Sequence, residues 1–157
     1  MNDNLIFLDI DGVIVSREGF RHPSYHNRQD AWESFSQDAL RALFHIIMKT
    51  EAKVVISSTW RRLYNDEELS IMFKKAYSSD IVKIIGSTPK SSHGCRGLEI
   101  DEWRDANDHT GPFVILDDDN DMTDYQKERH FIRTKLDVGL TMLDAVEACA
   151  KLIGVTS

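Results

Sequence analysis

Short apolar segments that alternate with helix-like segments constrain the fold of this chain more than any other feature. Runs with the length and composition of buried strands occur at 5–10 (LIFLDI), 53–57 (KVVIS), 81–86 (IVKIIG) and 113–117 (FVILD), with a weaker one at 130–134 (HFIRT). Apolar residues recur with helical spacing at 37–49, 65–77, 97–107 and 141–153. Nearly continuous apolar strands are typical of parallel sheets that are buried on both faces. We therefore predict an α/β fold, a parallel sheet with helices on both faces.

The composition favours one globular domain and excludes several classes of protein. The chain has 157 residues, of which 41% are hydrophobic, and a net charge of −7. A surface that is acidic overall does not favour non-specific binding to a nucleic-acid backbone. No apolar stretch is long enough to span a bilayer, so we expect no membrane partner, and the N-terminus does not resemble a signal peptide. Cys95 and Cys149 lie far apart, and we expect both to be free thiols in a reducing cytoplasm.

The first apolar run ends in two aspartates, Asp9 and Asp11, separated by one isoleucine. Side chains alternate along a strand, so the two carboxylates would point the same way if the strand continued. Like charges at that distance repel each other and raise each other's pKa. Either the strand ends here and the pair is solvated, or a cation lies between the two carboxylates.

Acids and hydroxyls also follow two later strands. Asp117, Asp118, Asp119 and Asp121 end or follow the run 113–117, and Ser57, Ser58 and Thr59 end or follow the run 53–57. Each group alone is compatible with an ordinary turn or helix cap. In a parallel sheet, however, the ends of these strands meet at one edge, where ligands bind in open α/β folds. Ligands that are all oxygen atoms favour Mg²⁺ over Zn²⁺, so we predict a magnesium site.

The segment 15–32 interrupts the alternation of strands and helices. It is polar, contains Gly19 and Pro23, and carries Arg17 and Arg21. Because it follows the first strand, it leaves the sheet at the predicted functional edge. We interpret it as a flap and treat Arg17 and Arg21 as candidate substrate-binding residues. A solvated basic loop explains the same pattern, and the sequence leaves both interpretations open.

Three segments resemble motifs of the haloacid dehalogenase (HAD) superfamily. FLDIDGVI resembles the first motif, VVISST the second and FVILDDDND the fourth. The segments SSTWR, STPK…RGLEIDEW and TKLDVGLTMLDAVEACAKL are similar to the compact HAD domain of Swiss Army Knife RNA repair proteins. The resemblance extends over about residues 4–153. It implies a Rossmann-like HAD fold, a single hydrolase domain over 1–157, and a minimal cap that consists of the short flap.

The resemblance also implies a reaction. Asp9 would attack phosphorus to form an aspartyl-phosphate, and Asp11 would protonate the leaving oxygen and later deprotonate water. Gly12 would let the chain turn away without a side chain in the pocket. Ser58, assisted by Thr59, would hydrogen-bond a phosphoryl oxygen.

Two assignments within the resemblance stay open. Mg²⁺ would lie between the Asp9 carboxylate, the Asp11 backbone carbonyl and an aspartate of the fourth motif, which is Asp117 or Asp118 depending on the register. The third motif should supply a base that stabilises the transferring phosphoryl group. Arg96 is the first choice for this catalytic role, and Lys90 is the second, as a substrate-binding base.

The short cap narrows the class of substrate. An open pocket admits large phosphorylated partners, so we expect a magnesium-dependent phosphomonoesterase acting on a nucleic-acid terminal phosphate or a nucleotide. A phosphatase of small metabolites and a non-catalytic protein that binds phosphorylated ligands are the alternatives. The Asp9, Asp11 and Ser58 set argues for catalysis, since a binding protein has no need of Asp11.

Overall fold

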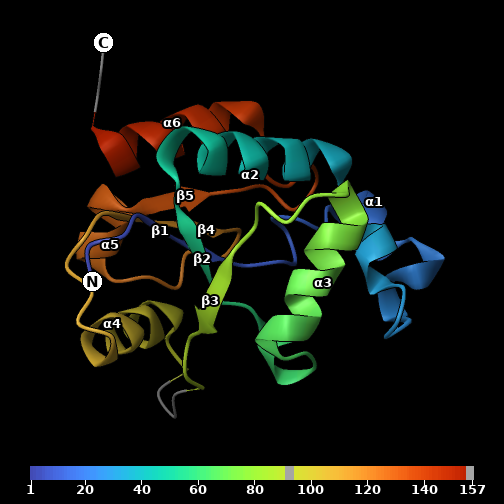
Figure 1. The fold of residues 1–157 in the computed structure, drawn as a ribbon, viewed down its shortest axis with the longest axis horizontal. Helices are drawn as coiled ribbons and strands as arrows, with labels where there is room; N and C mark the ends of the chain where they lie inside the picture. The colour runs from blue at the N-terminus through green and yellow to red at the C-terminus, as the bar shows by residue number, and fades with distance from the viewer. Residues whose placement is uncertain (91–93, 155–157) are drawn as a thin grey trace.

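The computed structural model describes residues 1–90 and 94–154. Five parallel strands form one sheet in the order β3-β2-β1-β4-β5 (Figure 1). The strands are β1 (Leu5–Leu8), β2 (Lys53–Ile56), β3 (Ile84–Ser87), β4 (Phe113–Asp117) and β5 (Phe131–Arg133). The predicted α/β class and parallel sheet are therefore confirmed, and the arrangement is Rossmann-like.

The helices begin and end close to the predicted positions. The long helices are α2 (Gln37–Thr50), α3 (Asp66–Tyr77), α4 (Arg96–Ala106) and α6 (Met142–Ile153), and shorter ones are α1 (Arg17–Phe20), η1 (Pro23–His26), η2 (Ala31–Ser34), η3 (Thr59–Arg62) and α5 (Asp124–Arg129). Side-chain caps explain this agreement: Ser36 accepts a hydrogen bond at the start of α2, and Asn65 and Thr141 form capping boxes at the starts of α3 and α6.

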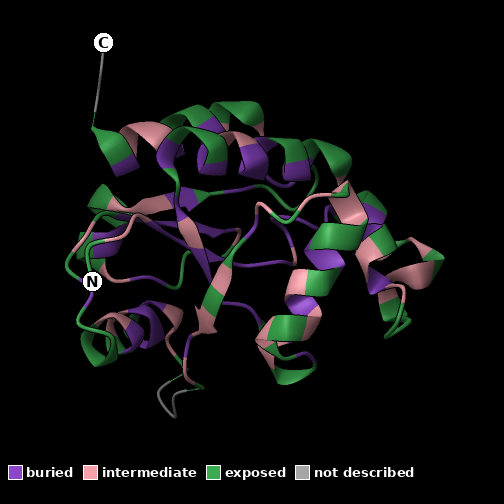
Figure 2. Ribbon diagram, viewed as in Figure 1, coloured by how far each residue is buried: buried purple, intermediate pink, exposed green. Residues whose placement is uncertain are grey.

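Alternating strand residues build a core on each face of the sheet. Ile6 and Leu8 belong to the larger core, which α2, α3 and α6 cover, whereas Leu5 and Phe7 belong to the smaller core beneath α4. The buried stripes of the helices face the sheet, and their exposed stripes face outward (Figure 2). Helices thus cover both faces, as the apolar strands indicate.

Two predicted segments differ from the structure. The third strand was expected at 81–86, but β3 is Ile84–Ser87. Val82 is buried in the larger core ahead of the strand, and the ladder shifts register between Val54 and Val55. The segment 15–32 contains α1, η1 and the start of η2. Its Tyr25 packs against the larger core, so the predicted flap is folded onto the domain.

Among the described residues, no helix has the length and apolar character needed to cross a membrane.

Candidate active site

Three carboxylates converge at the carboxyl edge of the sheet. Asp9 follows β1 and Asp117 ends β4, and these strands are neighbours with Leu8 paired to Leu116. Asp118 follows directly. One carboxylate oxygen from each aspartate lies within 4.8 Å of the others. Asp9 is only 5% exposed and Asp117 only 1%, so water solvates this concentration of charge poorly.

Arg96 contacts two of the three aspartates. It is the first residue of α4, and its Nη1 lies 2.7 Å from Asp117 Oδ2 and 3.3 Å from Asp9 Oδ2. Lys90, the alternative base, is exposed, and no hydrogen bond or ion pair joins it to the aspartates in the described parts of the chain. The geometry therefore favours Arg96 for the phosphoryl-binding role.

The aspartate cluster carries more negative charge than Arg96 can neutralise. Burial raises the pKa of Asp9 well above its ordinary value, the charge of Asp117 raises it further, and Arg96 acts in the opposite direction. Burial also raises the pKa of Asp117, which Arg96 partly offsets. Burial alone would lower the pKa of Arg96, but the charges of Asp9 and Asp117 raise it overall. One arginine does not neutralise three carboxylates, and a hard divalent cation with oxygen ligands fits this donor set.

The Asp11 carboxylate lies apart from the other three. Its Oδ1 accepts hydrogen bonds from Trp60 Nε1 at 2.9 Å and from the Tyr25 hydroxyl at 3.0 Å. Burial raises the pKa of Asp11, and the bonds from Trp60 and Tyr25 lower it in part. We did not assign either aromatic residue from the sequence, because residues 25 and 60 are brought to Asp11 only by the folding of the flap and η3.

Gly12 makes room for Asp118. Its φ of +84° is in the left-handed region, and a Cβ atom at this position would lie 2.3 Å from Asp118 Cγ. The Gly12 carbonyl accepts a hydrogen bond from the Thr134 hydroxyl at 2.7 Å. A side chain at position 12 would therefore strain the turn and displace one of the three clustered carboxylates.

The hydroxyl groups after β2 are placed differently from one another. Ser58 is fully buried, and its Oγ accepts a hydrogen bond from the Trp60 backbone N–H at 3.2 Å as the N-cap of η3. Ser57 Oγ is buried and has no hydrogen-bond partner within the described residues. Since Leu8 pairs with Ile56, Ser57 lies beside Asp9. Ser57 is one of the hydroxyl residues noted in the sequence but has no predicted role there, although counting the register from the two apolar runs indicates its place beside Asp9.

Arg61 and Glu99 hold the loop after β2. Arg61 Nη1 donates to the Ser58 carbonyl at 2.6 Å, and Nη2 forms a buried ion pair with Glu99 at 3.2 Å. Glu99 belongs to α4, the helix that begins with Arg96. This pair fixes the hydroxyl-bearing loop against the helix that carries the phosphoryl-binding candidate.

Residues 5–145 match the family model described as the HAD domain in Swiss Army Knife RNA repair proteins. The chain belongs to this HAD family. No curated protein and no solved structure matches the chain. The family relationship is consistent with the parallel sheet and with phosphatase-type chemistry at the carboxyl edge.

The two arginines predicted to bind substrate in the HAD flap do not contact the aspartate cluster. Arg17 forms an exposed ion pair with Asp137. Arg21 is exposed, and its side chain makes no hydrogen bond or ion pair with the described residues. Thr59, in contrast, is exposed at the rim of a hollow that also contains Asp11. The structure thus brings Thr59 near the site and leaves Arg17 and Arg21 apart from it.

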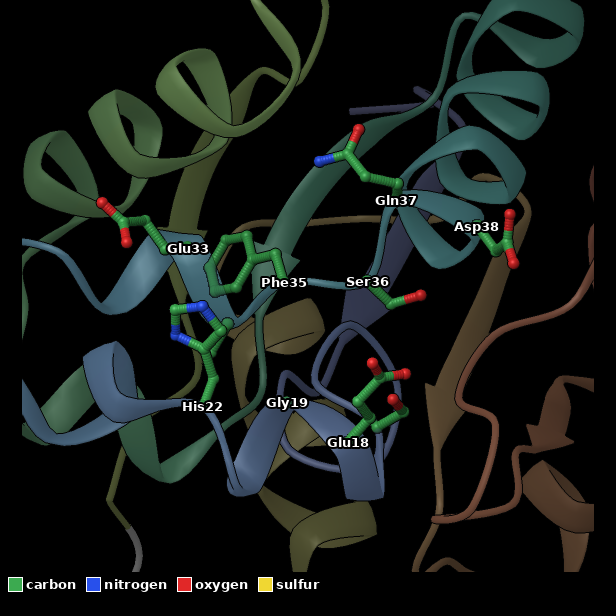
Figure 3. A pocket seen from close by; sticks show the side chains of 10 residues that line it. Glu18, Gly19, His22, Glu33, Phe35, Ser36, Gln37 and Asp38 are labelled. Carbon is green, nitrogen blue, oxygen red and sulfur yellow. The ribbon is translucent and has the colours of Figure 1, made fainter.

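A separate hollow of about 270 Å³ lies between the flap and the start of α2. Figure 3 shows side chains of Glu18 and His22 from the flap, Glu33 from η2 and Asp38 from α2 around it. Asp9, Asp11 and Arg96 do not line this hollow. The active-site candidate of the HAD domain is therefore the aspartate cluster and not the hollow at α2.

Proposed function

We propose that the chain is a magnesium-dependent phosphomonoesterase that acts through an aspartyl-phosphate at Asp9 on a nucleotide or a nucleic-acid terminal phosphate. The observation that carries the proposal is the meeting of Asp9, Asp117 and Asp118 with Arg96 at the ends of adjacent strands. The coarser conclusion, a hydrolase of phosphatase type, follows from membership of the HAD family.

In the first half of the reaction, an Asp9 carboxylate oxygen attacks phosphorus and the bond from phosphorus to the ester oxygen breaks. Asp11 donates its proton to the leaving oxygen. Burial supports this role because it raises the pKa of Asp11 and so retains the proton at higher pH. Arg96 stabilises the negative charge of the transferring phosphoryl group.

In the second half, Asp11 removes a proton from water, which attacks phosphorus and breaks the acyl-phosphate bond to Asp9. Inorganic phosphate leaves, and both aspartates return to their starting protonation states. Ser58, Thr59 and the unpartnered hydroxyl of Ser57 are the candidates to donate hydrogen bonds to phosphoryl oxygens.

Mg²⁺ would be held by Asp9, Asp118 and the Asp11 backbone carbonyl, with Asp117 completing the acidic set. Asp117 Oδ2 is engaged by Arg96, whereas the Asp118 carboxylate occupies the space over Gly12, which favours Asp118 as the direct ligand. When bound, the ion shields the negative charge of the nucleophile from that of the phosphate.

The description of the matching family supports a nucleic-acid end as substrate. We further propose that residues 1–157 act as a single hydrolase domain whose minimal cap is the flap at about 15–32. The flap supplies Tyr25, which contacts Asp11, so its folded part reaches the reacting groups even though Arg17 and Arg21 do not contact them.

Phosphate release from a substrate panel tests the proposal. The panel contains an aryl phosphate, an alkyl phosphate, 5′- and 3′-mononucleotides, and RNA and DNA oligomers with either terminal phosphate. We expect release that requires Mg²⁺, stops with EDTA and is lost in Asp9→Asn, with the acyl-phosphate trapped in the wild-type protein by acid quenching. Release that persists in Asp9→Asn, or no release from any substrate, would overturn the proposal.

A further inference from the structure

A hollow of about 410 Å³ opens directly beside Asp11. This volume lies within the range of pockets that hold small organic ligands. Its walls include Asp11 from the turn after β1, Tyr25 and Arg28 from the flap, and Trp60, Leu63 and Tyr64 from the segment after β2. We call this hollow the aromatic pocket. Nothing in the reaction proposed above uses Leu63 or Tyr64.

The base of the aromatic pocket is made of flat rings. Trp60 and Tyr64 are 5% and 8% exposed, and their ring centroids lie 5.5 Å apart with an interplanar angle of 31°. The Tyr25 ring meets Trp60 edge-on at 6.1 Å. Leu63 stands at the rim with 62% of its surface exposed. A planar group placed here would contact the exposed parts of Trp60 and Tyr64, the Arg28 guanidinium that lies over the Tyr64 ring, and Leu63 at the rim.

Two side chains of the aromatic pocket form hydrogen bonds with Asp11, the proposed general acid. Trp60 Nε1 and the Tyr25 hydroxyl both donate to Asp11 Oδ1. The group that accepts a proton from Asp11 is the leaving oxygen of the phosphoester. The rest of the leaving group must therefore lie next to Asp11, and the aromatic pocket is a hollow that Asp11 itself lines.

The charge of the pocket disfavours a second phosphate. Arg28 lies over the Tyr64 ring, 4.8 Å from its centroid, and is already paired with Glu68 at 3.0 Å. Its guanidinium also donates to the Leu63 carbonyl. The charge of Arg28 is thus offset, and the pocket offers rings and an aliphatic rim to an uncharged planar group.

We infer that the aromatic pocket binds the base of a nucleoside leaving group by stacking, and that it selects nucleotides over phosphoesters without a ring. This inference rests on the proposed function and names the part of its substrate that is recognised. A mononucleotide and the terminal nucleotide of a chain both offer a base, so the assay has to separate them. Stacking on aromatic side chains is tolerant of base identity, and we expect all four bases to bind.

The first test compares kcat/KM for a mononucleotide, for an oligonucleotide with a terminal phosphate and for glycerol phosphate. We expect the nucleotide to exceed glycerol phosphate by at least about 10-fold, and Leu63→Ala to lower this ratio roughly 3- to 10-fold. Leu143→Ala is the matched control, because Leu143 is a leucine 84% exposed on α6, and its ratio should equal that of the wild type. The better of the two nucleotide substrates identifies the source of the base.

The second test measures binding without turnover. Asp9→Asn protein is titrated with nucleosides and with ribose while tryptophan fluorescence is recorded. We expect nucleosides to quench the emission and ribose to leave it unchanged, with weaker nucleoside binding when Leu63→Ala is added.

The outcomes separate the two proposals. Equal kcat/KM for nucleotide and glycerol phosphate, with no nucleoside binding, overturns the inference and leaves the phosphatase standing. Nucleoside binding without phosphate release from any substrate supports the pocket and overturns the phosphatase. A ratio that Leu63→Ala and Leu143→Ala change equally also overturns the pocket assignment.

Discussion

The two ends of the parallel sheet differ in how their charged and polar groups are paired. At the carboxyl end, Asp9, Asp117 and Asp118 each place a carboxylate oxygen within 4.8 Å of the others, and Arg96 pairs with Asp9 and Asp117. At the amino end, the buried side chain of His109 has a hydrogen-bond partner at each ring nitrogen. His109 Nδ1 accepts from Arg104 Nε at 3.1 Å, and His109 Nε2 donates to the Asp3 carbonyl at 2.8 Å.

At the amino end, Phe113, the first residue of β4, also makes favourable contacts. The Phe113 ring stacks on His130 with centroids 3.8 Å apart, and the Arg104 guanidinium lies 4.0 Å above the same ring. Such contacts stabilise the fold. The carboxyl end instead retains repulsion that a bound cation and a phosphate can relieve. One end of the sheet therefore serves stability, and the other is arranged for chemistry at a cost in stability.

Of the changes considered, Asp9→Asn should have the largest effect on the difference between the two ends of the sheet. We expect kcat to fall by about 10⁴-fold or more, because the nucleophile is lost. Without divalent cations, the free energy of unfolding should rise by about 0.5–2 kcal/mol, since one buried repelling charge is removed. Urea denaturation measures the second effect. Asp80→Asn, an exposed carboxylate, is the control, and a destabilised Asp9→Asn protein would contradict the comparison.

Arg96→Gln should damage both activity and stability. The substitution leaves Asp9 and Asp117 without their cation, so we expect a loss of about 1–3 kcal/mol in the free energy of unfolding. The loss of phosphoryl stabilisation should lower kcat/KM by about 10²–10³-fold. Arg62→Gln removes an exposed arginine from η3 and should change neither quantity. Equal effects of the two variants would show that Arg96 has no special role.

Binding of Mg²⁺ should relieve the charge repulsion at the carboxyl end of the sheet and so reduce its difference from the amino end. At a free concentration of about 100 times Kd, binding adds about 2.7 kcal/mol, which corresponds to a rise in Tm of roughly 5–10 °C. EDTA should reverse the rise. Asp118→Asn should weaken it, whereas Asp119→Asn, which alters a neighbouring exposed side chain, should not. A Tm that is insensitive to Mg²⁺ in a calorimeter would contradict a cation site at the cluster.

Protonation of His109 and His130 at low pH should destabilise the amino end of the sheet. Burial lowers the pKa of His109 and of His130 below 6.5 in the folded protein. The unfolded chain therefore binds more protons between the folded pKa values and 6.5, and stability falls as pH drops through 6.5. Thermal melts in EDTA between pH 5 and 7.5, compared between the wild type and His130→Gln, measure this slope, the smallest effect of the four, because the raised pKa of Asp9 acts in the opposite direction in both proteins. His130→Gln should flatten it, and an unchanged slope would contradict the assignment.

The sequence predicts much of this fold because local signals agree with the tertiary structure. Ser36, Asn65 and Thr141 mark helix starts through their own side chains, and apolar runs mark strands that are buried on both faces. β3 was misplaced because Ile81 and Val82 are apolar but pack ahead of the ladder, and a short apolar run does not say which of its residues pair.

Part of the candidate site likewise follows from the sequence, and part depends on the tertiary structure. The meeting of Asp9 with the Asp117–Asp118 pair follows from the sequence alone, because parallel strands must end at one edge. The sequence ranks Arg96 ahead of Lys90, but only the tertiary structure shows the contact that separates them, since the start of α4 brings Arg96 to Asp9 and Lys90 is exposed. Only the folded flap brings Tyr25 to Asp11 and forms the aromatic pocket. Such contacts join residues from separate segments, and no local pattern encodes them.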